Sequence, residues 1–253
     1  MMINFSKISS KSFIGKFLRW TLKLIPKNCV LPILQGKLKG TKWIIGSGVY
    51  GYWLGCYELE KQKLFIQKIK KGDVVYDVGA HVGFYTLLAS KLVGKQGWVY
   101  AFEPNPQNAY FLLKHIQLNK IKNVKLILGA LGENYGLKFL SNKGSESKIE
   151  EKNLKSEIIT PIFPIDDLVL KNKIIPPPQV LKIDVEGYEL NVLKGAKQIL
   201  KKHKPILFVA LDNEDTKSEV YEFIKNLGYN IFDLNLKKIE QLKINNYNEI
   251  ICF

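Results

Sequence analysis

Short apolar segments alternate with stretches of helical period along most of this chain, and this alternation limits the fold more than any other feature. The segments expected to form parallel strands are 74–78, 98–102, 124–128, 180–185 and 206–211. The segments expected to form helices are 58–70, 84–92, 105–116, 190–200 and 216–227. Residues 231–234 and 249–253 are expected to close the sheet as an antiparallel pair. The pattern predicts an α/β fold with a doubly wound, mostly parallel, seven-stranded sheet.

Two segments interrupt the alternation. Residues 141–157 are polar and charged and contain glycine, so we expect a loop or a mobile flap there. Residues 171–179 contain three consecutive prolines and are expected to form an extended connector. Long loops inside a compact domain are often functional lids.

The N-terminal region carries a basic amphipathic pattern. Between Lys11 and Pro26, apolar side chains alternate with Lys16, Arg19 and Lys23 at helical spacing. The segment lacks the continuous apolar core and the small-residue cleavage site of a signal peptide. We favour a helix whose apolar face packs on the domain or on a second subunit. The alternative is peripheral contact with an anionic membrane.

The domain organisation follows from these patterns. A hairpin is expected over 36–46, where Gly40 and Thr41 separate two short apolar runs. We therefore predict an extension of amphipathic helix and hairpin over residues 1–56, with residues 12–25 as the segment that would meet a membrane. The cofactor-binding domain is predicted over residues 57–253.

The charge balance is strongly positive, with 38 basic and 23 acidic residues and a net charge of +15. Such an excess suits nucleic acid, an anionic membrane or an acidic polymer substrate. Arg19 is the only arginine, and lysine lacks the bidentate geometry with which arginine reads phosphate and guanine. Nucleic acid is therefore the disfavoured partner.

The cysteines and the apolar runs indicate a compartment. The three cysteines are scattered and form neither a disulfide framework nor a zinc site. No uncharged apolar run reaches the roughly 18 residues that a membrane span needs. We expect a cytoplasmic protein, with a peripheral position at the inner membrane face as the alternative. The oligomeric state is not indicated.

The turn after the first expected strand is the first candidate for ligand binding. Asp77 ends that strand, and Gly79 and Gly83 follow in the spacing G-x-x-x-G. Glycine lets the backbone approach a ligand closely, and the next helix offers free N–H groups. A dinucleotide-binding turn reads G-x-G-x-x-G, so a nicotinamide cofactor is disfavoured. Asp77 would accept from an ammonium group but repel a phosphate, which favours a ligand with an amino-acid end.

Glu103 strengthens this interpretation. It ends the second expected strand, 24 residues after Gly79 (103 − 79), where an acidic residue holds the ribose hydroxyls of an adenosine. Pro104 and Asn105 follow directly and restrict its direction. The two strand ends together predict a site for an adenosine cofactor.

Several further motifs accompany this site. They are Tyr57-Glu58, Gly72 to Thr86, Ala101 to Pro106, Gly129-Ala130-Leu131-Gly132, Ile165-Asp166-Asp167-Leu168 and Leu181-Lys182-Ile183-Asp184-Val185-Glu186-Gly187-Tyr188-Glu189. Together they resemble the FkbM-type methyltransferases, over about residues 40–215. The Lys-Ile-Asp-Val-Glu-Gly run is the most specific of them.

The resemblance implies a class I, Rossmann-like methyltransferase fold that transfers a methyl group from S-adenosylmethionine, commonly to a hydroxyl of a sugar or natural product. The residues that it implies for cofactor binding are Asp77, Gly79, Ala80, His81, Gly83, Glu103, Pro104, Asn105 and Ala130. Of these, the glycine turn would line the methionine end, Glu103 would hold the ribose and Ala130 would lie near the adenine. Asp184 and Glu186 would face the acceptor.

The chain departs from the family pattern at three positions. His81 stands where asparagine is usual, and Tyr188 stands where histidine is usual. Ala210 stands where the fifth strand usually carries a glutamate. If that glutamate takes part in the chemistry, Asp212 or Glu214 would have to replace it here, or the acceptor differs.

The acceptor hydroxyl is a poor nucleophile, so a general base near its proton would help. Glu186 is the first candidate for this base and Asp184 the second, with His81 less favoured. The two carboxylates could instead bind a divalent metal, or one of them could cap the following helix. We predict no metal site.

The predicted function is methyl transfer from S-adenosylmethionine to a hydroxyl on a sugar, a glycan or a small metabolite. RNA ribose methylation is one alternative. DNA amino-methylation is disfavoured because the turn after the fourth strand, Asp184 to Gly187, lacks the Pro-Pro-aromatic sequence that holds a flipped base. A cofactor-binding module without catalysis is the other alternative, motivated by Ala210.

Overall fold

The computed structural model describes residues 12, 20, 22, 24–143, 146–150 and 158–253. Most of the helix predicted between Lys11 and Pro26 lies outside the described residues. Residues 151–157 of the predicted flap also lie outside them.

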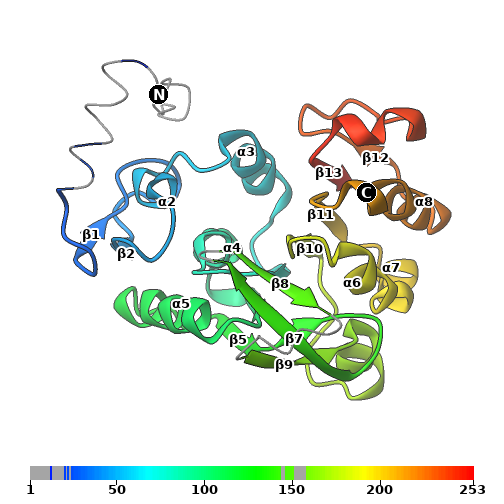
Figure 1. The fold of residues 1–253 in the computed structure, drawn as a ribbon, viewed down its shortest axis with the longest axis horizontal. Helices are drawn as coiled ribbons and strands as arrows, with labels where there is room; N and C mark the ends of the chain where they lie inside the picture. Colours follow the sequence, from blue (N-terminus) through cyan, green and yellow to red (C-terminus); the bar gives the residue numbers. More distant parts are fainter. Residues whose placement is uncertain (1–11, 13–19, 21, 23, 144–145, 151–157) are drawn as a thin grey trace.

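A seven-stranded sheet forms the centre of the described structure (Figure 1). Its strands lie in the order β12-β13-β11-β10-β3-β4-β5. They are β3 (Val74–Val78), β4 (Trp98–Glu103), β5 (Val124–Leu128), β10 (Val180–Ile183), β11 (Ile206–Ala210), β12 (Ile231–Phe232) and β13 (Glu249–Cys252). β5, β4, β3, β10 and β11 are parallel, and β13 pairs antiparallel with β11 and β12. The predicted fold class and the closing antiparallel pair are confirmed.

The order of the strands creates a crevice beside β3. The chain winds outward from β3 through β4 and β5, then returns to place β10 on the other side of β3. Connections that leave two neighbouring strands in opposite directions leave a crevice at their carboxyl ends, where ligands bind in open α/β sheets. The crevice here lies beyond Val78 and Ile183.

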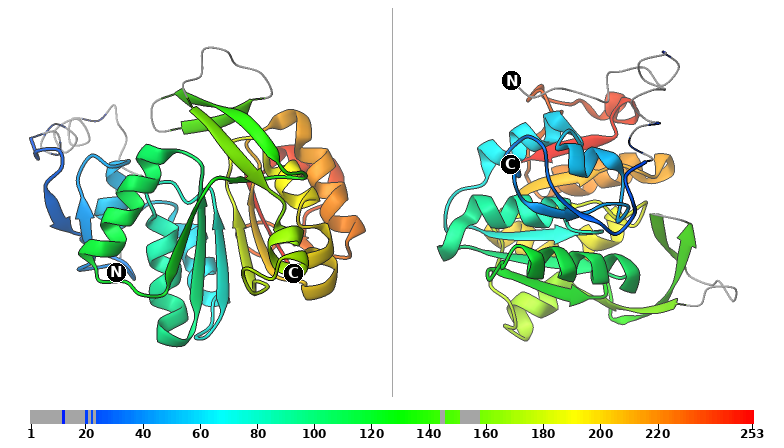
Figure 2. Two further views of the ribbon diagram at one scale, coloured as in Figure 1. Left: turned by 90° about the horizontal axis from the view of Figure 1, so that it is seen from below. Right: turned by 90° about the vertical axis from the view of Figure 1, so that its left-hand side faces the viewer.

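Helices cover both faces of the sheet (Figure 2). On one face, α3 (Leu59–Lys68), α4 (Phe84–Val93) and α5 (Pro106–Leu118) pack over Val75, Val99 and Ala101. On the other, α6 (Glu189–Lys194), α7 (Lys197–His203) and α8 (Lys217–Asn226) pack over Tyr76 and Val78. Shorter helical turns are η2 (Gly94–Gln96), η3 (Asp167–Lys171), η4 (Glu214–Thr216) and η5 (Gln241–Asn246).

Two details of the helices test the sequence patterns. Asn105 caps α5, because its side chain accepts from the backbone N–H groups of Gln107 and Asn108. The single helix predicted over 190–200 is wrong, since the chain forms α6 and α7 with Gly195 between them. A Cβ at Gly195 would lie 1.9 Å from the carbonyl oxygen of Gly132, so the close approach of these two backbones interrupts the helix.

The loop predicted over 141–157 is also wrong where it is described. β7 (Gly136–Lys143) and β8 (Glu146–Glu150) form a hairpin within a second sheet of order β6-β9-β7-β8, with β6 (Ala130–Leu131) and β9 (Ile158–Phe163). β7 pairs with both β8 and β9, so its stability comes from strand pairing that local polarity does not reveal. The hairpin extends over the crevice and contributes Ile149 to the pocket described below.

The N-terminal extension shares a core with the main sheet. β1 (Val30–Pro32) pairs antiparallel with β2 (Lys42–Ile44), so a hairpin exists in this region. Its first strand lies before the predicted range 36–46, and its second strand lies within that range. α2 (Tyr50–Leu54) follows. Apolar side chains of this region, including Trp43 and Tyr52, belong to the same hydrophobic cluster as Val75 and Leu88 of the sheet layer.

His115 joins the extension to the sheet. Its ring stacks on Trp43 with 3.9 Å between ring centroids, and its Nε2 accepts from the backbone N–H of Ile44 at 3.1 Å. Its Nδ1 lies 2.8 Å from the carbonyl oxygen of Val82, so a neutral ring that donates there satisfies both contacts. Burial lowers the pKa of His115 to about 4, so the ring is neutral at pH 7 and its role here is structural.

Candidate active site

A pocket with a cavity volume of about 190 Å³ lies at the carboxyl ends of β3, β4 and β10. Its lining combines the glycine turn, strand ends, an aromatic wall and the tip of the second sheet. The lining residues are Val49, Tyr52, Tyr57, Val78, Gly79, Ala80, His81, Phe84, Tyr85, Phe102, Glu103, Pro104, Asn108, Ala130, Leu131, Ile149, Lys182, Asp184, Val185 and Glu186. Eight of the eleven site residues predicted from the sequence line this pocket, and Asp77, Gly83 and Asn105 lie outside its lining.

The glycine turn is built by close backbone contacts. Gly79 has a φ of +74°, and a Cβ there would lie 1.8 Å from the carbonyl oxygen of Asp184. Gly83 has a φ of +98°, and a Cβ there would meet Leu112 at 2.3 Å. Both positions accept only glycine, because larger residues would push the turn away from β10 or α5. Gly83 is buried behind the pocket lining, whereas Gly79 and Ala80 line it.

Glu103 holds the turn from the neighbouring strand. Its carboxylate accepts from the backbone N–H of His81 at 2.7 Å and from that of Asn105 at 2.9 Å. Burial raises the pKa of Glu103 to about 7, against the effect of these two hydrogen bonds. Its side chain lies in the pocket lining beside Pro104 and Asn108. Asn105, expected at the cofactor, serves instead as the cap of α5 and lies outside the lining.

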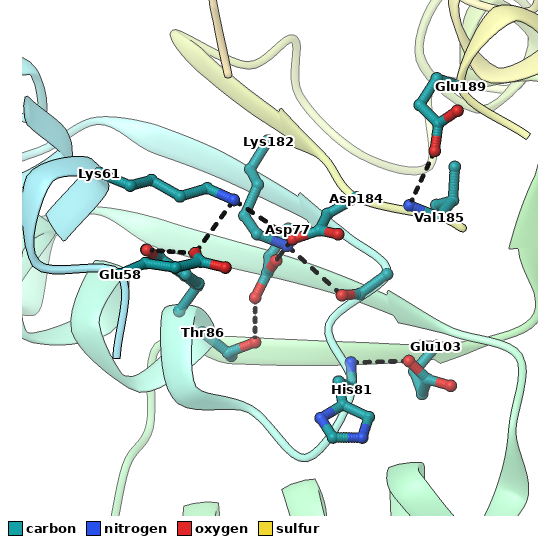
Figure 3. Close-up of polar contacts among 12 residues, drawn as sticks. Glu58, Lys61, Asp77, His81, Thr86, Glu103, Lys182, Asp184, Val185 and Glu189 are labelled. Atoms are coloured by element: carbon teal, nitrogen blue, oxygen red, sulfur yellow. Dashed lines mark hydrogen bonds and ion pairs between the residues drawn. The ribbon is translucent and has the colours of Figure 1, made fainter. Parts of the chain in front are cut away.

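Asp77 lies beneath the pocket rather than in its lining. It is fully buried, and one carboxylate oxygen accepts from the hydroxyl of Thr86 at 2.6 Å. The other lies 3.1 Å from the ammonium of Lys182, which itself reaches the pocket wall. Asp77, expected at the methionine end of the cofactor, is thus placed as the anchor of Lys182 (Figure 3).

Asp184 lies at the pocket wall between two lysines. Its Oδ2 is 3.4 Å from Lys182 Nζ and 3.3 Å from Lys61 Nζ. Burial alone would raise the pKa of Asp184, but these two ammonium groups hold it well below its usual range. Asp184 is therefore a fixed negative charge with little affinity for a proton.

Lys61 was not singled out by any sequence pattern. Its side chain is 2% exposed and contacts Glu58 at 3.2 Å and Asp184 at 3.3 Å (Figure 3). It also contacts Glu249. Burial disfavours its charge, yet the three carboxylates raise the pKa of Lys61 well above its ordinary value. It stays protonated and links α3 to the carboxyl ends of the sheet.

No sequence pattern indicated a role for Glu249 at the site either. It begins β13 and pairs directly opposite Ala210 in the antiparallel register, so a carboxylate stands across the ladder from the position where the family usually has a glutamate. Of the two expected substitutes, Glu214 binds Lys217 at 2.7 Å. Asp212 follows the end of β11 and interacts electrostatically with Asp184 and Lys61, so it lies near the same charged groups. A cross-strand neighbour has no fixed sequence offset, so the place of Glu249 could not be predicted.

Glu186 lies in the pocket lining with a φ of +54°. The loop that presents it is held from below by Glu189, whose carboxylate accepts from the N–H groups of Gly187 at 2.9 Å and Val185 at 3.4 Å. Burial raises the pKa of Glu189 to about 7. Glu189 thus binds backbone N–H groups before α6, close to the capping role that was one alternative for Asp184 or Glu186. The Glu186 residue itself lines the pocket.

Aromatic side chains form the wall opposite the sheet. Tyr52 and Tyr57 lie edge to face with 4.5 Å between ring centroids, and Tyr52 stacks on Phe84. The Tyr52 hydroxyl lies 3.3 Å from Nδ1 of His81, whose own φ is +51°. Tyr52 comes from the N-terminal extension, so the pocket includes residues from outside the predicted cofactor-binding domain.

Two other properties concern metal ions and membranes. In the described part of the chain, no three His, Cys, Asp or Glu side chains gather as metal ligands. No helix formed by the described residues has the length and apolar character to cross a membrane.

The doubly wound sheet and a pocket between a glycine turn and an acidic strand end define a class I methyltransferase. The methyltransferase FkbM domain profile matches residues 77–231, which is more than half of the chain. The chain therefore belongs to the FkbM methyltransferase family, and S-adenosylmethionine is its cofactor.

Two curated proteins and one solved structure illustrate the similarity. The hexuronic acid methyltransferase AglP of Haloferax volcanii is 27% identical over 139 residues, which is 55% of this chain and 56% of that protein. A protein-L-isoaspartate O-methyltransferase of Fervidobacterium nodosum is 36% identical over 62 residues, 24% of this chain and 31% of that protein. The FkbM methyltransferase of Methylobacillus flagellatus has 17% identity and a TM-score of 0.51, with 81% of this chain and 53% of that one covered. The chain thus spans about half the length of AglP and of the Methylobacillus protein.

The residues of the pocket fit this cofactor. Gly79 lines the pocket in a turn that packs closely against the backbone of Asp184, and Glu103 presents a carboxylate suited to ribose hydroxyls. Asp184 adds a permanent negative charge at the wall, which suits a ligand with positive groups.

Proposed function

We propose that this methyltransferase transfers the methyl group of S-adenosylmethionine to a hydroxyl of a sugar, with a uronic acid or a glycan containing one as the acceptor class. The observation that carries the proposal is the pair of carboxylates after β10: Asp184 is pinned by two lysines, whereas Glu186 lies in the lining of the same pocket. The similarity to a hexuronic acid methyltransferase supports the acceptor class.

The cofactor residues that we propose are Gly79, Ala80, His81, Glu103, Pro104 and Ala130, all in the pocket lining. Asp77, Gly83 and Asn105 would act indirectly, by holding Lys182, the turn and α5 in place. When bound, S-adenosylmethionine supplies an electrophilic methyl group on a good leaving group. The protein's part is then to place an acceptor oxygen in line with that methyl and to accept its proton.

Glu186 is the proposed general base. A base must be able to take up a proton, and Asp184 is poorly suited because Lys182 and Lys61 hold its pKa low. Asp184 would instead contribute a fixed negative charge to the site. Glu186 directly precedes Gly187, whose backbone N–H donates to Glu189. The loop is therefore fixed, and Glu186 lines the pocket.

The charge of the chain supports an anionic acceptor. A net charge of +15 attracts a carboxylate-bearing sugar and increases its local concentration. We also propose a cytoplasmic location, with residues 12–25 as a peripheral contact to the inner membrane face if the glycan is lipid-linked. The boundary between an extension (1–56) and the methyltransferase domain (57–253) remains part of this proposal.

The test is methyl transfer from labelled S-adenosylmethionine to glucuronic and galacturonic acid glycosides, with the matching neutral glycosides as controls. We expect labelled methyl ether on the uronic acid acceptors and release of S-adenosylhomocysteine. Glu186→Gln should keep the cofactor Kd within about twofold while kcat falls about 10²- to 10⁴-fold. Unchanged kcat would remove Glu186 from the base role.

The same assay separates the alternatives. Cofactor binding without transfer to any acceptor would indicate a non-catalytic module. Transfer to RNA ribose, with none to glycosides, would replace the sugar proposal with the nucleic-acid one.

A further inference from the structure

A group of six charged side chains lies in the pocket wall and behind it, and we name it the buried charge cluster because both of its lysines and Asp77 are buried. Its carboxylates are Asp77, Asp184, Glu58 and Glu249, and its ammonium groups are Lys61 and Lys182. Each lysine therefore forms ion pairs with more than one carboxylate. With every member ionised, carboxylates exceed ammonium groups by two, so the cluster presents a net negative charge.

Glu249 is a cluster member that does not line the pocket. It lies outside the lining and contacts Lys61, which is also outside the lining. Lys61 in turn lies 3.3 Å from Asp184, a lining residue. The negative charge of Glu249 therefore acts on the pocket through Lys61: the more Lys61 is balanced by Glu249, the less it cancels Asp184.

The two ligands of a methyltransferase differ in charge. S-adenosylmethionine carries one positive charge more than S-adenosylhomocysteine, at its sulfonium, and the two molecules otherwise share the same groups. A net negative charge beside the pocket stabilises the first relative to the second.

We propose that Glu249 is a specificity-determining positioning residue that, through Lys61 and Asp184, makes the pocket prefer the charged methyl donor over the neutral product. The proposal rests on the cofactor assignment and not on the identity of the acceptor. It gives a function to a half-buried carboxylate that lies outside the pocket lining. It also gives a reason for placing a lysine with three acidic neighbours inside the protein.

The ionisation of Glu249 makes the preference depend on pH. The titratable groups that face it are Lys61 and Glu58 from the α3 region, Asp184 from the loop after β10, and Tyr85 from α4. Burial raises the pKa of Glu249 to about 7, with Lys61 acting in the opposite direction. Glu249 is thus largely protonated at pH 6 and largely ionised at pH 8, so the preference for the donor should be greater at the higher pH.

The experiment measures Kd for both ligands by isothermal titration calorimetry, in the wild type and in Glu249→Gln, at pH 6.0 and 7.8. The glutamine keeps an oxygen that accepts from Lys61 but removes the charge. At pH 7.8 we expect donor affinity to fall about three- to tenfold more than product affinity. This is the size of effect expected when one unit charge is removed roughly 10 Å away, at an effective dielectric constant near 20 and with partial screening by salt. At pH 6.0 the difference should shrink. Ionisation of the ligand's own amino group is the same for both proteins, so the comparison cancels it.

Glu240→Gln is the matched control, since Glu240 forms a solvent-exposed pair with Lys243 at 2.9 Å. It should change neither Kd. Equal losses for the two ligands in Glu249→Gln, or no loss for either, would overturn the proposal, because a purely structural role does not distinguish the donor from the product.

The wild type supplies a second measurement in case the variant does not fold. Its ratio of product Kd to donor Kd should rise between pH 6 and 8, and a flat or falling ratio would overturn the proposal. Glu103 lines the pocket and its pKa is also raised to about 7, so the midpoint of the rise is not assigned to Glu249 alone. Failure of the wild type to bind either ligand is a separate outcome, which would refute the cofactor assignment itself.

Discussion

Replacement of Lys182 by methionine tests the buried charge cluster most directly. The Lys182 ammonium lies 3.1 Å from Asp77 and 3.4 Å from Asp184, with the Lys182 side chain 3% exposed and that of Asp77 fully buried. Methionine keeps most of the volume, but it removes the ammonium beside Asp77 Oδ1 and keeps the hydrogen bond from the Thr86 hydroxyl to Asp77 Oδ2. Breaking a buried ion pair by removing one partner costs about 3–5 kcal/mol. That is a large share of the roughly 5–15 kcal/mol that stabilise a typical domain.

The assay is urea unfolding followed by far-ultraviolet circular dichroism, with the free energy of unfolding taken by linear extrapolation. The double variant Asp77→Asn with Lys182→Met removes both charges and should recover at least about 2 kcal/mol of the loss, as coupled neighbours do. Lys171→Met is the matched control, because Lys171 forms an exposed pair with Asp167 at 3.4 Å and should lose less than about 1 kcal/mol. A loss below about 1 kcal/mol in Lys182→Met, or strict additivity in the double variant, would refute the reasoning.

Three further predictions concern the turn, the extension and the response to pH. Gly79→Ala should abolish cofactor binding in equilibrium titrations, because its Cβ would lie 1.8 Å from the Asp184 carbonyl oxygen. The control Gly72→Ala has a similar φ of +89° with no atom within 4 Å, so it should bind normally and lose only about 1–2 kcal/mol of stability. His115→Leu should lower the free energy of unfolding in urea by about 2–4 kcal/mol, because two buried backbone groups lose their partner. The control His203→Leu, at an exposed position, should lower it by less than about 0.5 kcal/mol. Stability should also fall as pH rises through 7, because burial raises the pKa of three carboxyl groups to about 7 from 4.5. These groups are Glu103, Glu189 and Glu249. The folded state keeps protons that the unfolded state releases, so this contribution is complete below pH 4.5 and is lost through pH 7, with a slope of up to about 1.4 kcal/mol per pH unit for each group. Urea midpoints that rise steadily between pH 5 and 8 would contradict it.

The central sheet could be predicted because its strands are buried on both faces and therefore appear as continuous apolar runs. The strand at Val74–Val78 and the cap at Asn105 are local signals of this kind, and both agree with the structure. The hairpin of β7 and β8 could not be predicted, because its polar strands are stabilised by pairing with β9 rather than by their own composition. Local sequence patterns report local preferences, and strand pairing overrides them.

The candidate site divides in the same way. Gly79 and Glu103 follow strands at positions where the fold dictates a ligand, so their place at the pocket could be expected. The buried positions of Asp77 and Lys61 could not, because each depends on partners far away in the sequence. Lysine is most often an exposed residue, and nothing near Lys61 in the chain marks it as one that three carboxylates surround.

The contact between Lys61 and Glu249 has a consequence for biosynthesis. During translation 188 further residues must be added after Lys61 before Glu249 exists (249 − 61), which takes about 10–40 s at typical rates of synthesis. Until then Lys61 lacks a native neighbour, and the edge of β11 that later pairs with β13 is uncovered. We expect the nascent chain to expose this edge of β11 to chaperones until β13 pairs with it.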